Sequence, residues 1–290
     1  MTADLHIGQR PEAVEIATGV RCGGNAPLLI IAGTCVLESR ESGMRHAAAL
    51  AEIAERLGVS LVFKASFDKA NRTSIDSPRG PGLDAGLEML AEIRNESGLA
   101  VTSDVHEAAQ CAAAGEVLDL LQIPAFLCRQ TDLLLAAAAT GCAVNVKKGQ
   151  FLSPWDVAPI AAKIESAGND KIVLTERGST FGYNNLVVDM RSLPVMRAAG
   201  RPVVFDATHS VQRPGGLGKT SGGDPEFIPV LARAAVAAGI DGIFFEVHED
   251  PAKALSDGAN ALALDRFEDT VRPLLEMHAV AQRHPVGVMP

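Results

Sequence analysis

Several features are missing from the 290-residue sequence, and each absence narrows the class of protein. No apolar run approaches the roughly 20 residues needed to cross a bilayer. The first ten residues lack the basic-then-apolar order of a secretory signal. We therefore expect a cytoplasmic protein with no membrane partner. A disulfide framework is not expected either, because the five cysteines are scattered and odd in number. They are Cys22, Cys35, Cys111, Cys128 and Cys142.

The chain also lacks an excess of positive charge. Its 26 Lys and Arg residues against 35 Asp and Glu residues give a formal net charge of −9. Nucleic acids and anionic membranes would repel an acidic surface without a basic stripe, so neither is expected as a partner. No proline-, serine- or charge-rich linker divides the chain. The hydrophobic share of 47% is sufficient for a full core.

A short apolar run, a polar or glycine-bearing loop and a helix-like stretch recur eight times from residue 27 onward. The predicted strands are Leu28 to Ala32, Leu61 to Ala65, Ala100 to Ser103, Leu118 to Ile123, Ala143 to Val146, Ile172 to Thr175, Pro202 to Phe205 and Gly242 to Glu246. The clearest predicted helices are Gly43 to Leu57, Gly86 to Glu96, Asp132 to Thr140, Pro154 to Ala167 and Pro225 to Ala238. Before this repeat, apolar residues around Gly8 and Gly19 predict a small packing hairpin in residues 1–26.

Apolar strands that alternate with helices are typical of a parallel sheet buried on both faces. Right-handed crossovers close eight such units into a (β/α)8 barrel more naturally than into an open sheet. The predicted fold is therefore an α/β TIM barrel over residues 27–290, preceded by the hairpin. Five glycines lie between Gln212 and Pro225, after the seventh strand. Their composition is compatible with a lid and equally with a floppy connection.

Polar and charged residues gather where the predicted strands end, which is the catalytic face of this fold. Any one of them could simply terminate a strand. Five cations, however, would meet at one mouth of an acidic protein and repel one another unless an anion lay among them. They are Lys64, Lys69, Arg72, Lys147 and Arg177. The sequence therefore predicts a small, multiply anionic substrate, and two cationic clusters would suit two phosphates.

The loop after the second strand, residues 64–74, has the composition of an anion site. Lysine offers point charges, arginine offers a planar fork, and hydroxyl groups complete the coordination of the oxygen atoms. A solvated surface loop uses the same residue types. This stretch alone therefore leaves both interpretations open.

A second group of residues has the donor types of a metal site. Cys35 follows the first strand, His209 follows the seventh, Glu246 ends the eighth, and Asp257 comes after it. These three strands are neighbours in a closed barrel, so one thiolate, one imidazole and two carboxylates can meet and bind a first-row divalent cation. Ordinary alternatives are a buried core cysteine or histidine and, at Asp257, an Asx turn.

Six segments carry a resemblance to a known family: residues 32–39, 63–74, 123–134, 145–151, 176–185 and 206–212. Together they are similar to 3-deoxy-D-manno-octulosonate 8-phosphate synthases, and the likeness extends from residue 27 to about residue 265. The resemblance implies a homotetrameric barrel that condenses phosphoenolpyruvate with arabinose 5-phosphate and releases phosphate, on the route to lipopolysaccharide. Members with cysteine at the position of Cys35 require a metal. The resemblance therefore implies a divalent Zn, Fe, Mn or Co ion bound by Cys35, His209, Glu246 and Asp257.

The resemblance also implies roles for individual residues. Those expected to bind substrate are Lys64, Ser66, Lys69, Asn71, Arg72, Thr73, Gln122, Lys147 and Arg177, and those expected in catalysis are Lys64, Asp104, Lys147 and His209. Arg72 would hold the phosphate of the pentose, whereas Lys147 and Arg177 would hold phosphoenolpyruvate. Thr34 departs from the family, which usually has proline there, but this change removes no ligand.

Two alternatives to this function come from different classes. The first is 3-deoxy-D-arabino-heptulosonate 7-phosphate synthase, which uses erythrose 4-phosphate as the acceptor and the same types of metal ligand. The second is a phosphosugar-binding protein without catalytic activity. Residues 69–74, Lys-Ala-Asn-Arg-Thr-Ser, speak against the first, because that relative typically has one residue fewer there and no asparagine. Retention of both proposed ligand sets speaks against the second.

Overall fold

The computed structural model describes residues 10–72, 74–216 and 221–285, and its central feature is a closed ring of eight parallel strands. In ring order these are β3 (Leu29–Gly33), β4 (Leu61–Lys64), β5 (Ala100–Asp104), β6 (Leu120–Ile123), β7 (Ala143–Lys147), β8 (Ile172–Glu176), β11 (Val203–Asp206) and β14 (Gly242–His248). β14 pairs with both β11 and β3 and so closes the ring. The predicted (β/α)8 barrel is confirmed, and each strand lies within two residues of its expected bounds.

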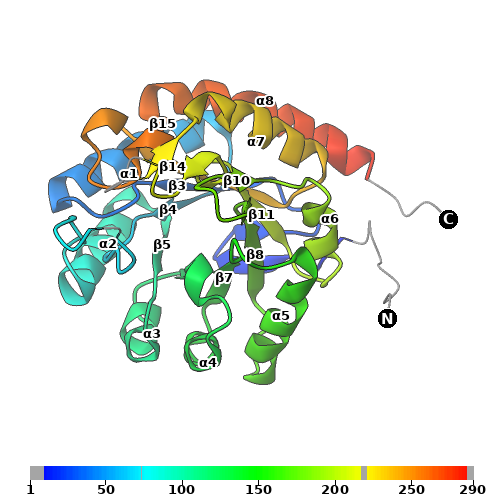
Figure 1. The fold of residues 1–290 in the computed structure, drawn as a ribbon, viewed down its shortest axis with the longest axis horizontal. Coiled ribbons are helices and arrows are strands. Elements are labelled where there is room, and N and C mark those ends of the chain that lie inside the picture. The colour runs from blue at the N-terminus through cyan, green and yellow to red at the C-terminus, as the bar shows by residue number, and fades with distance from the viewer. Residues whose placement is uncertain (1–9, 73, 217–220, 286–290) are drawn as a thin grey trace.

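Helices surround the strands, with α3 to α5 on one side of the ring and α7 and α8 on the opposite side (Figure 1). They are α1 (Arg40–Leu57), α2 (Leu83–Ser97), α3 (Ala108–Gly115), α4 (Thr131–Ala139), α5 (Val157–Ser166), α6 (Ser192–Arg197), α7 (Ile228–Ala237) and α8 (Leu264–Arg283). The helices predicted from Pro154 and Pro225 begin as 3-10 turns, η2 (Pro154–Asp156) and η4 (Pro225–Phe227), and continue as α5 and α7. Proline suits such a first turn because its missing N–H would have no partner there.

Side chains inside the ring follow the strand period of two. Leu29 and Ile31 of β3 pack inside the barrel, whereas Ile30 and Ala32 pack toward the helices. The antiparallel hairpin β1 (Val14–Ala17) and β2 (Val20–Cys22) contributes apolar side chains to the same inner cluster, so it closes the amino end of the barrel. The packing hairpin is thus confirmed, although Gly8 lies outside the described residues.

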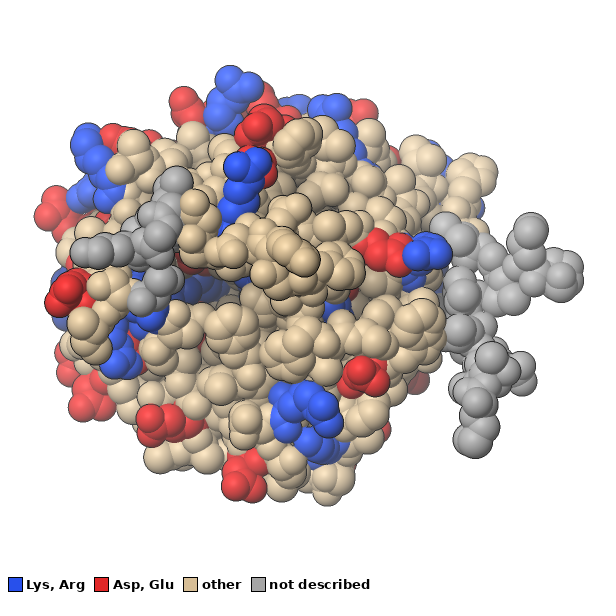
Figure 2. All heavy atoms as spheres, viewed as in Figure 1, with Lys and Arg blue, Asp and Glu red and all other residues tan. Residues whose placement is uncertain are grey.

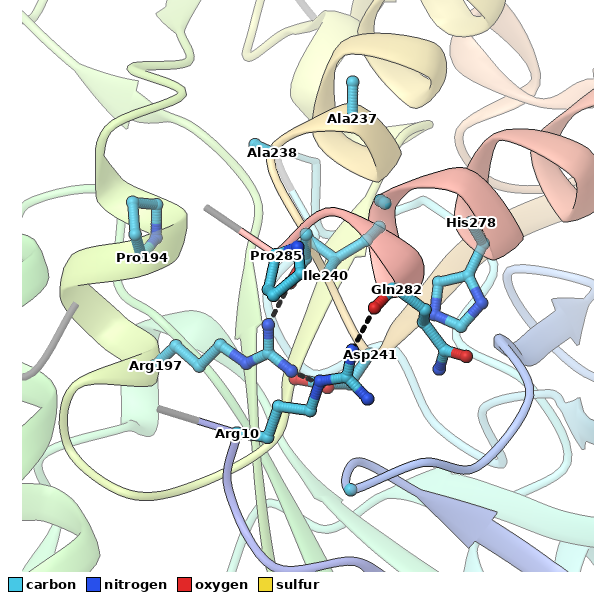
Figure 3. A pocket seen from close by; sticks show the side chains of 13 residues that line it. Arg10, Pro194, Arg197, Ala237, Ala238, Ile240, Asp241, His278, Gln282 and Pro285 are labelled. Carbon is cyan, nitrogen blue, oxygen red and sulfur yellow. Dashed lines mark hydrogen bonds and ion pairs between the residues drawn. The ribbon is translucent and has the colours of Figure 1, made fainter. Parts of the chain in front are cut away.

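A small cavity of about 40 Å³ lies beside this hairpin, where Arg10 and Arg197 converge toward Asp241 (Figure 3). Arg197 Nη2 donates to Asp241 Oδ1 at 2.6 Å, and Asp241 Oδ2 accepts from the backbone N–H of Val203 at 2.9 Å. Burial raises the pKa of Asp241 to about 6 despite the nearby arginine. The cavity is too small for a metabolite, so this end of the barrel is structural.

Short elements lie at the opposite, carboxyl end of the barrel. They are the hairpin β9 (Ser179–Thr180) with β10 (Leu186–Val187), the hairpin β12 (Gln212–Arg213) with β13 (Gly222–Gly223), strand β15 (Leu262–Ala263), and the turns η1 (Ala125–Leu127), η3 (His209–Val211), η5 (Pro251–Lys253) and η6 (Gly258–Asn260). The glycine-rich connection is therefore tied at both ends by β12 and β13. Residues 217–220 lie outside the described part, so a lid there stays a prediction.

Charges of both signs lie on the face of the molecule that Figure 2 shows. Lys and Arg are interspersed with Asp and Glu around its outline, and its centre is largely free of both (Figure 2). Among the described helices, none is long and apolar enough to span a bilayer.

Candidate functional site

A cavity of about 820 Å³ opens at the carboxyl ends of the barrel strands. At this end of the ring the inward-facing positions carry polar side chains in place of apolar ones. Ten of the predicted site residues line the cavity: Lys64, Lys69, Asn71, Arg72, Asp104, Gln122, Lys147, Arg177, His209 and Asp257. The closed barrel therefore gathers residues that are far apart in the sequence.

Among the described residues, three predicted ones do not line the cavity. Cys35 and Glu246 are buried beside it. Ser66 is fully buried, and its hydroxyl donates to Asp104, so it supports a cavity residue and does not face the cavity itself. Thr73 lies outside the described residues. Their roles toward substrate or metal stay predictions.

Each lysine at the mouth has a carboxylate partner. This corrects the expectation that only a bound anion could offset the repulsion among the cations. The pairs are Lys64 with Glu246 at 2.9 Å, Lys69 with Asp104 at 3.7 Å, and Lys147 with Asp206. Removing one partner from a buried pair costs about 3–5 kcal/mol, because the other charge stays buried alone. The lysines and the carboxylates of this layer therefore depend on each other.

The same pairs set the protonation of the carboxylates. Burial raises the pKa of Glu246, but the positive charges of His209 and Lys64 outweigh burial and bring it to about 2. Burial also raises the pKa of Asp104, and Lys69 and Lys64 more than offset it, so this pKa lies well below its usual value. Both groups are ionised at neutral pH.

Asp206 is a central residue that was not among the predicted site residues. Its Oδ2 contacts Lys147 and lies 2.7 Å from His209 Nδ1, while Oδ1 accepts the backbone N–H of His209 at 2.8 Å. Burial raises its pKa, but His209 and Lys147 hold it well below its usual value. This contact turns His209 Nε2 toward Glu246 and Asp257, at 3.5 and 3.9 Å. A carboxylate three residues before a histidine at a strand end was the available signal.

The two arginines lack the partners that the lysines have. Within the described residues, no carboxylate lies within 4.0 Å of Arg177 or Arg72. Arg177 Nη2 donates to Gln212 Oε1 at 3.1 Å, and its Nη1 is buried without a partner. Arg72 Nη2 donates to the Leu255 carbonyl at 3.0 Å, Nη1 contacts Ser256, and Nε is buried without a partner. Their positive charge is therefore available for an anion.

The four predicted metal ligands come together beside the cavity. One ligand atom from each of Cys35, Glu246 and Asp257 lies within 4.8 Å of the others, and Cys35 Sγ is 3.2 Å from Asp257 Oδ2. Glu246 Oε2 is buried without a hydrogen-bond partner in the described structure. Burial and Glu246 raise the pKa of the Cys35 thiol well above its usual value, so the thiol is protonated without a cation. This donor set, with His209 Nε2 facing it, fits a divalent transition metal.

A chain of hydrogen bonds inside the barrel fixes Gln122 and Asp104. Thr175 donates to Asn145 at 2.6 Å, Asn145 donates to Gln122 at 3.0 Å, and Gln122 donates to Asp104 Oδ1 at 2.6 Å. Each amide is satisfied on both sides, so the chain has one arrangement. The chain fixes the part of the cavity wall that β5 to β8 form. This part lies opposite β3, β11 and β14, near whose ends the proposed metal ligands lie.

A close approach of two strands places Cys35 against Lys64. A Cβ on Gly33 would lie 2.0 Å from the Lys64 carbonyl oxygen, so only glycine fits. Lys64 Nζ then donates to the Cys35 carbonyl at 2.9 Å. Thr34, where the family usually has proline, donates its hydroxyl to the Val36 carbonyl at 3.0 Å. This bond ties the turn that proline would otherwise stiffen.

Several further cavity residues were not predicted as site residues. They are His106, Phe126, Gln150, Gln212 and Ser256. Gln212 begins the short strand β12 and Ser256 lies on the loop after β14, and only the folded chain shows that they touch Arg177 and Arg72. No spacing in the sequence could have assigned them to those partners.

The low pKa of Glu246 predicts a pH dependence of stability in the metal-free protein. A carboxylate with a folded pKa below its unfolded value adds stability above the unfolded pKa, and this stability is lost as the pH falls. We expect Glu246 to contribute about 3 kcal/mol to the free energy of unfolding, lost between pH 4.5 and about 2. Urea unfolding should therefore depend less on pH in Glu246→Gln over this range. Equal pH dependence of variant and wild type would contradict the prediction. Glu41→Gln, at an exposed carboxylate, is the control.

Comparisons with known proteins agree with this geometry. The model of the DAHP synthetase I family matches residues 9–283. The chain is 61% identical over 276 residues to 2-dehydro-3-deoxyphosphooctonate aldolase of Rhodopseudomonas palustris (strain BisB5), covering 95% of this chain and 96% of the relative. It is 61% identical to the enzyme of that name from Pelobacter propionicus (97% and 100% covered) and 57% identical to the one from Syntrophotalea carbinolica (94% and 98% covered). This chain therefore belongs to the DAHP synthetase I family.

Proposed function

We propose that this protein condenses phosphoenolpyruvate with D-arabinose 5-phosphate and water to give 3-deoxy-D-manno-octulosonate 8-phosphate and inorganic phosphate, a step of lipopolysaccharide synthesis. The observation that carries the proposal is a single cavity with two arginines that have no carboxylate partner, which suits two phosphorylated substrates. Relatives that are 57–61% identical and named 2-dehydro-3-deoxyphosphooctonate aldolase support it.

Phosphoenolpyruvate is assigned to the side of the cavity that carries Lys147 and Arg177. Arg177 can offer its unpartnered Nη1 to a phosphate or carboxylate oxygen. Lys147 is fixed by Asp206 and by the Phe244 ring, whose centroid lies 3.4 Å from Nζ. Lys69 also lines this cavity, with its Nζ 3.7 Å from Asp104 Oδ2, and adds a further cation.

Arabinose 5-phosphate is assigned to the side formed by the loop after β4. Arg72 would bind its phosphate through its positive charge and through Nε, which has no partner in the described structure. Asn71 lies next to it in the cavity wall, and Thr73 is proposed from the sequence alone. Lys64 lines the same cavity and is assigned to the space between the two substrates.

The reaction needs two substrates held face to face. C3 of phosphoenolpyruvate forms a bond to the aldehyde carbon, the aldehyde oxygen takes a proton, and water adds at C2 with loss of a proton. The resulting hemiketal phosphate releases inorganic phosphate and leaves a keto group. Positioning of this kind is worth several kcal/mol. Asp104 is ionised and lines the cavity, so it is placed to orient the water, while His209 and Glu246 are the other proton carriers to consider.

We also propose that Cys35, His209, Glu246 and Asp257 hold a divalent transition metal, which would supply a Lewis acid for the aldehyde oxygen or a bound water. Support comes from the donor types, from their convergence and from the buried Glu246 oxygen without a partner. Asp206 orients His209, and Gln212 Nε2 donates to Asp257 Oδ1 at 2.8 Å. Ligands in metal sites are commonly oriented by such neighbours.

A phosphate-release assay distinguishes the proposed acceptor from its relative. We expect phosphate release from phosphoenolpyruvate with arabinose 5-phosphate, and at most a small fraction of this rate with erythrose 4-phosphate. The reason is that residues 69–74 include Asn71, which the heptulosonate relative typically lacks. Arg72→Ala should raise the KM for the pentose about 10- to 100-fold through loss of charged hydrogen bonds. The exposed Arg191→Ala is the matched control. Faster release with erythrose 4-phosphate, or no release with either sugar, would contradict the proposal.

Removal of the metal tests the ligand set. We expect a chelator to abolish turnover and Zn, Fe, Mn or Co to restore it, since three of the four ligands lie within 4.8 Å of one another. In Cys35→Asn, some turnover should persist in the presence of chelator, because the family that the sequence resembles also has metal-independent members, with asparagine at this position. Cys128→Ser, at a buried cysteine away from the ligands, is the control. Full activity of metal-free wild type would contradict the metal proposal.

We propose that four copies assemble, and that exposed apolar residues lie between them. Most apolar side chains of a soluble protein are covered, yet large ones are exposed after β6, β7 and β8. They are Phe126, Phe151, Trp155, Phe181, Tyr183 and Val187. A location in the cytoplasm stays a prediction of the N-terminal sequence, open to test by cell fractionation.

Light scattering should give four times the 30.3 kDa mass of the chain. Trp155, which is 59% exposed in the single chain, is the only tryptophan, so its fluorescence should shift to the red when dilution separates the copies. Trp155→Glu should reduce the mass, whereas Val230→Glu, at an exposed position on α7, should not. A monomeric mass at high protein concentration would rule the assembly out.

A further inference from the structure

One loop serves both halves of the proposed site. Residues 249–261 connect β14 to β15. Within them, the Leu255 carbonyl and the Ser256 hydroxyl accept from Arg72, and Asp257 next in sequence contacts Cys35. Three consecutive residues thus contact the proposed pentose-phosphate arginine on one side and a proposed metal ligand on the other. The conformation of this loop therefore determines the geometry of both the proposed pentose-phosphate site and the proposed metal site.

Three buried or half-buried side chains hold the loop through its backbone. His46 Nε2 accepts the N–H of Glu249 at 3.0 Å. His248 Nδ1 accepts the N–H of Asp250 at 3.0 Å. Glu38 Oε1 accepts the N–H of Leu255 at 2.9 Å. The two histidines fix the start of the loop, and the Glu38 bond falls directly before Ser256 and Asp257.

Glu38 is also tied to the rest of the site. It follows Cys35 by three residues, on the connection between β3 and α1. Its Oε1 lies 3.4 Å from His248 Nε2. No hydrogen bond joins these two atoms, so the bond to the Leu255 N–H is what ties Glu38 to the loop. Glu38 therefore links the loop that carries Cys35 with the loop that carries Asp257.

We propose that Glu38 is a positioning residue that couples the two half-sites. By holding the Leu255 N–H, it sets where the Leu255 carbonyl meets Arg72 and where Asp257 meets Cys35. It touches neither substrate nor the reacting atoms, and it does not line the cavity. The inference rests on the proposed function only for which substrate Arg72 holds.

Hydrogen exchange measures this contact directly. In Glu38→Ala, the amide of Leu255 should exchange about tenfold faster or more, because a hydrogen bond to a charged acceptor is lost. Glu38→Gln should restore slow exchange, since its amide oxygen can still accept. Glu41→Ala, which removes an exposed carboxylate from the same helix region, is the matched control and should behave as wild type. Unchanged exchange in Glu38→Ala would overturn the proposal.

Binding and kinetics test the coupling. Glu38→Ala should weaken binding of Co²⁺ to the metal-free protein and raise the KM for arabinose 5-phosphate, each about tenfold. The KM for phosphoenolpyruvate should stay within about twofold, because its proposed ligands Lys147 and Arg177 lie at the ends of β7 and β8, away from this loop. Glu38→Gln should restore both. An equal rise in both KM values, or a Glu38→Gln variant as impaired as Glu38→Ala, would overturn the proposal. If Glu38→Ala does not fold, Glu38→Asp, which withdraws the carboxylate by one methylene, is judged by the same readouts.

The proposed function and this inference fail in different ways. Wild type without turnover on arabinose 5-phosphate would refute the function, while exchange at Leu255 and Co²⁺ binding would still report on Glu38. Wild type with turnover, combined with normal exchange and binding in Glu38→Ala, would refute the positioning role alone.

Discussion

A lysine buried in a protein interior needs a carboxylate beside it, and this requirement organises the carboxyl end of the barrel. Lys64 and Lys147 are almost fully buried, and each faces a buried acid on another strand, Glu246 or Asp206. The lysine charges are therefore largely balanced before any substrate arrives. Arg177 and Arg72 keep an unbalanced positive charge, because within the described residues both donate hydrogen bonds to neutral oxygen atoms only. The anion specificity of the cavity thus depends on Arg177 and Arg72 more than on the lysines.

The same acids link substrate binding to the proposed metal. Glu246 uses one oxygen for Lys64 and leaves the other without a partner. Asp206 contacts both Lys147 and His209, so a change in the charge or position of either side chain affects the other. On the opposite side, the loop after β14 supports Arg72 and carries Asp257. The metal half and the phosphate half of the site therefore share their supports, which accounts for their closeness in a single cavity.

The sequence was sufficient for the fold because strand period, helix period and β/α alternation all pointed to the same architecture. It also identified the residues at the strand ends, since inward positions near the carboxyl ends must face one cavity. It could not identify which carboxylate pairs with which lysine, because pairing depends on strand register. The pairing of Asp206 with Lys147 was missed for that reason, although its spacing from His209 was a signal for their contact. Gln212 and Ser256 lie in a two-residue strand and a loop, where no period relates sequence position to direction, so their contacts with Arg177 and Arg72 could not be derived.

The central claim is that metal ligands and phosphate ligands share one cavity at the carboxyl ends of the strands. Anomalous diffraction from crystals that contain Co²⁺ and phosphoenolpyruvate tests it most directly. The account predicts one cobalt peak bonded to Cys35, His209, Glu246 and Asp257, and a substrate phosphate on Arg177 in the same cavity. A cobalt ion bound elsewhere, or a phosphate bound away from Arg177, would contradict it.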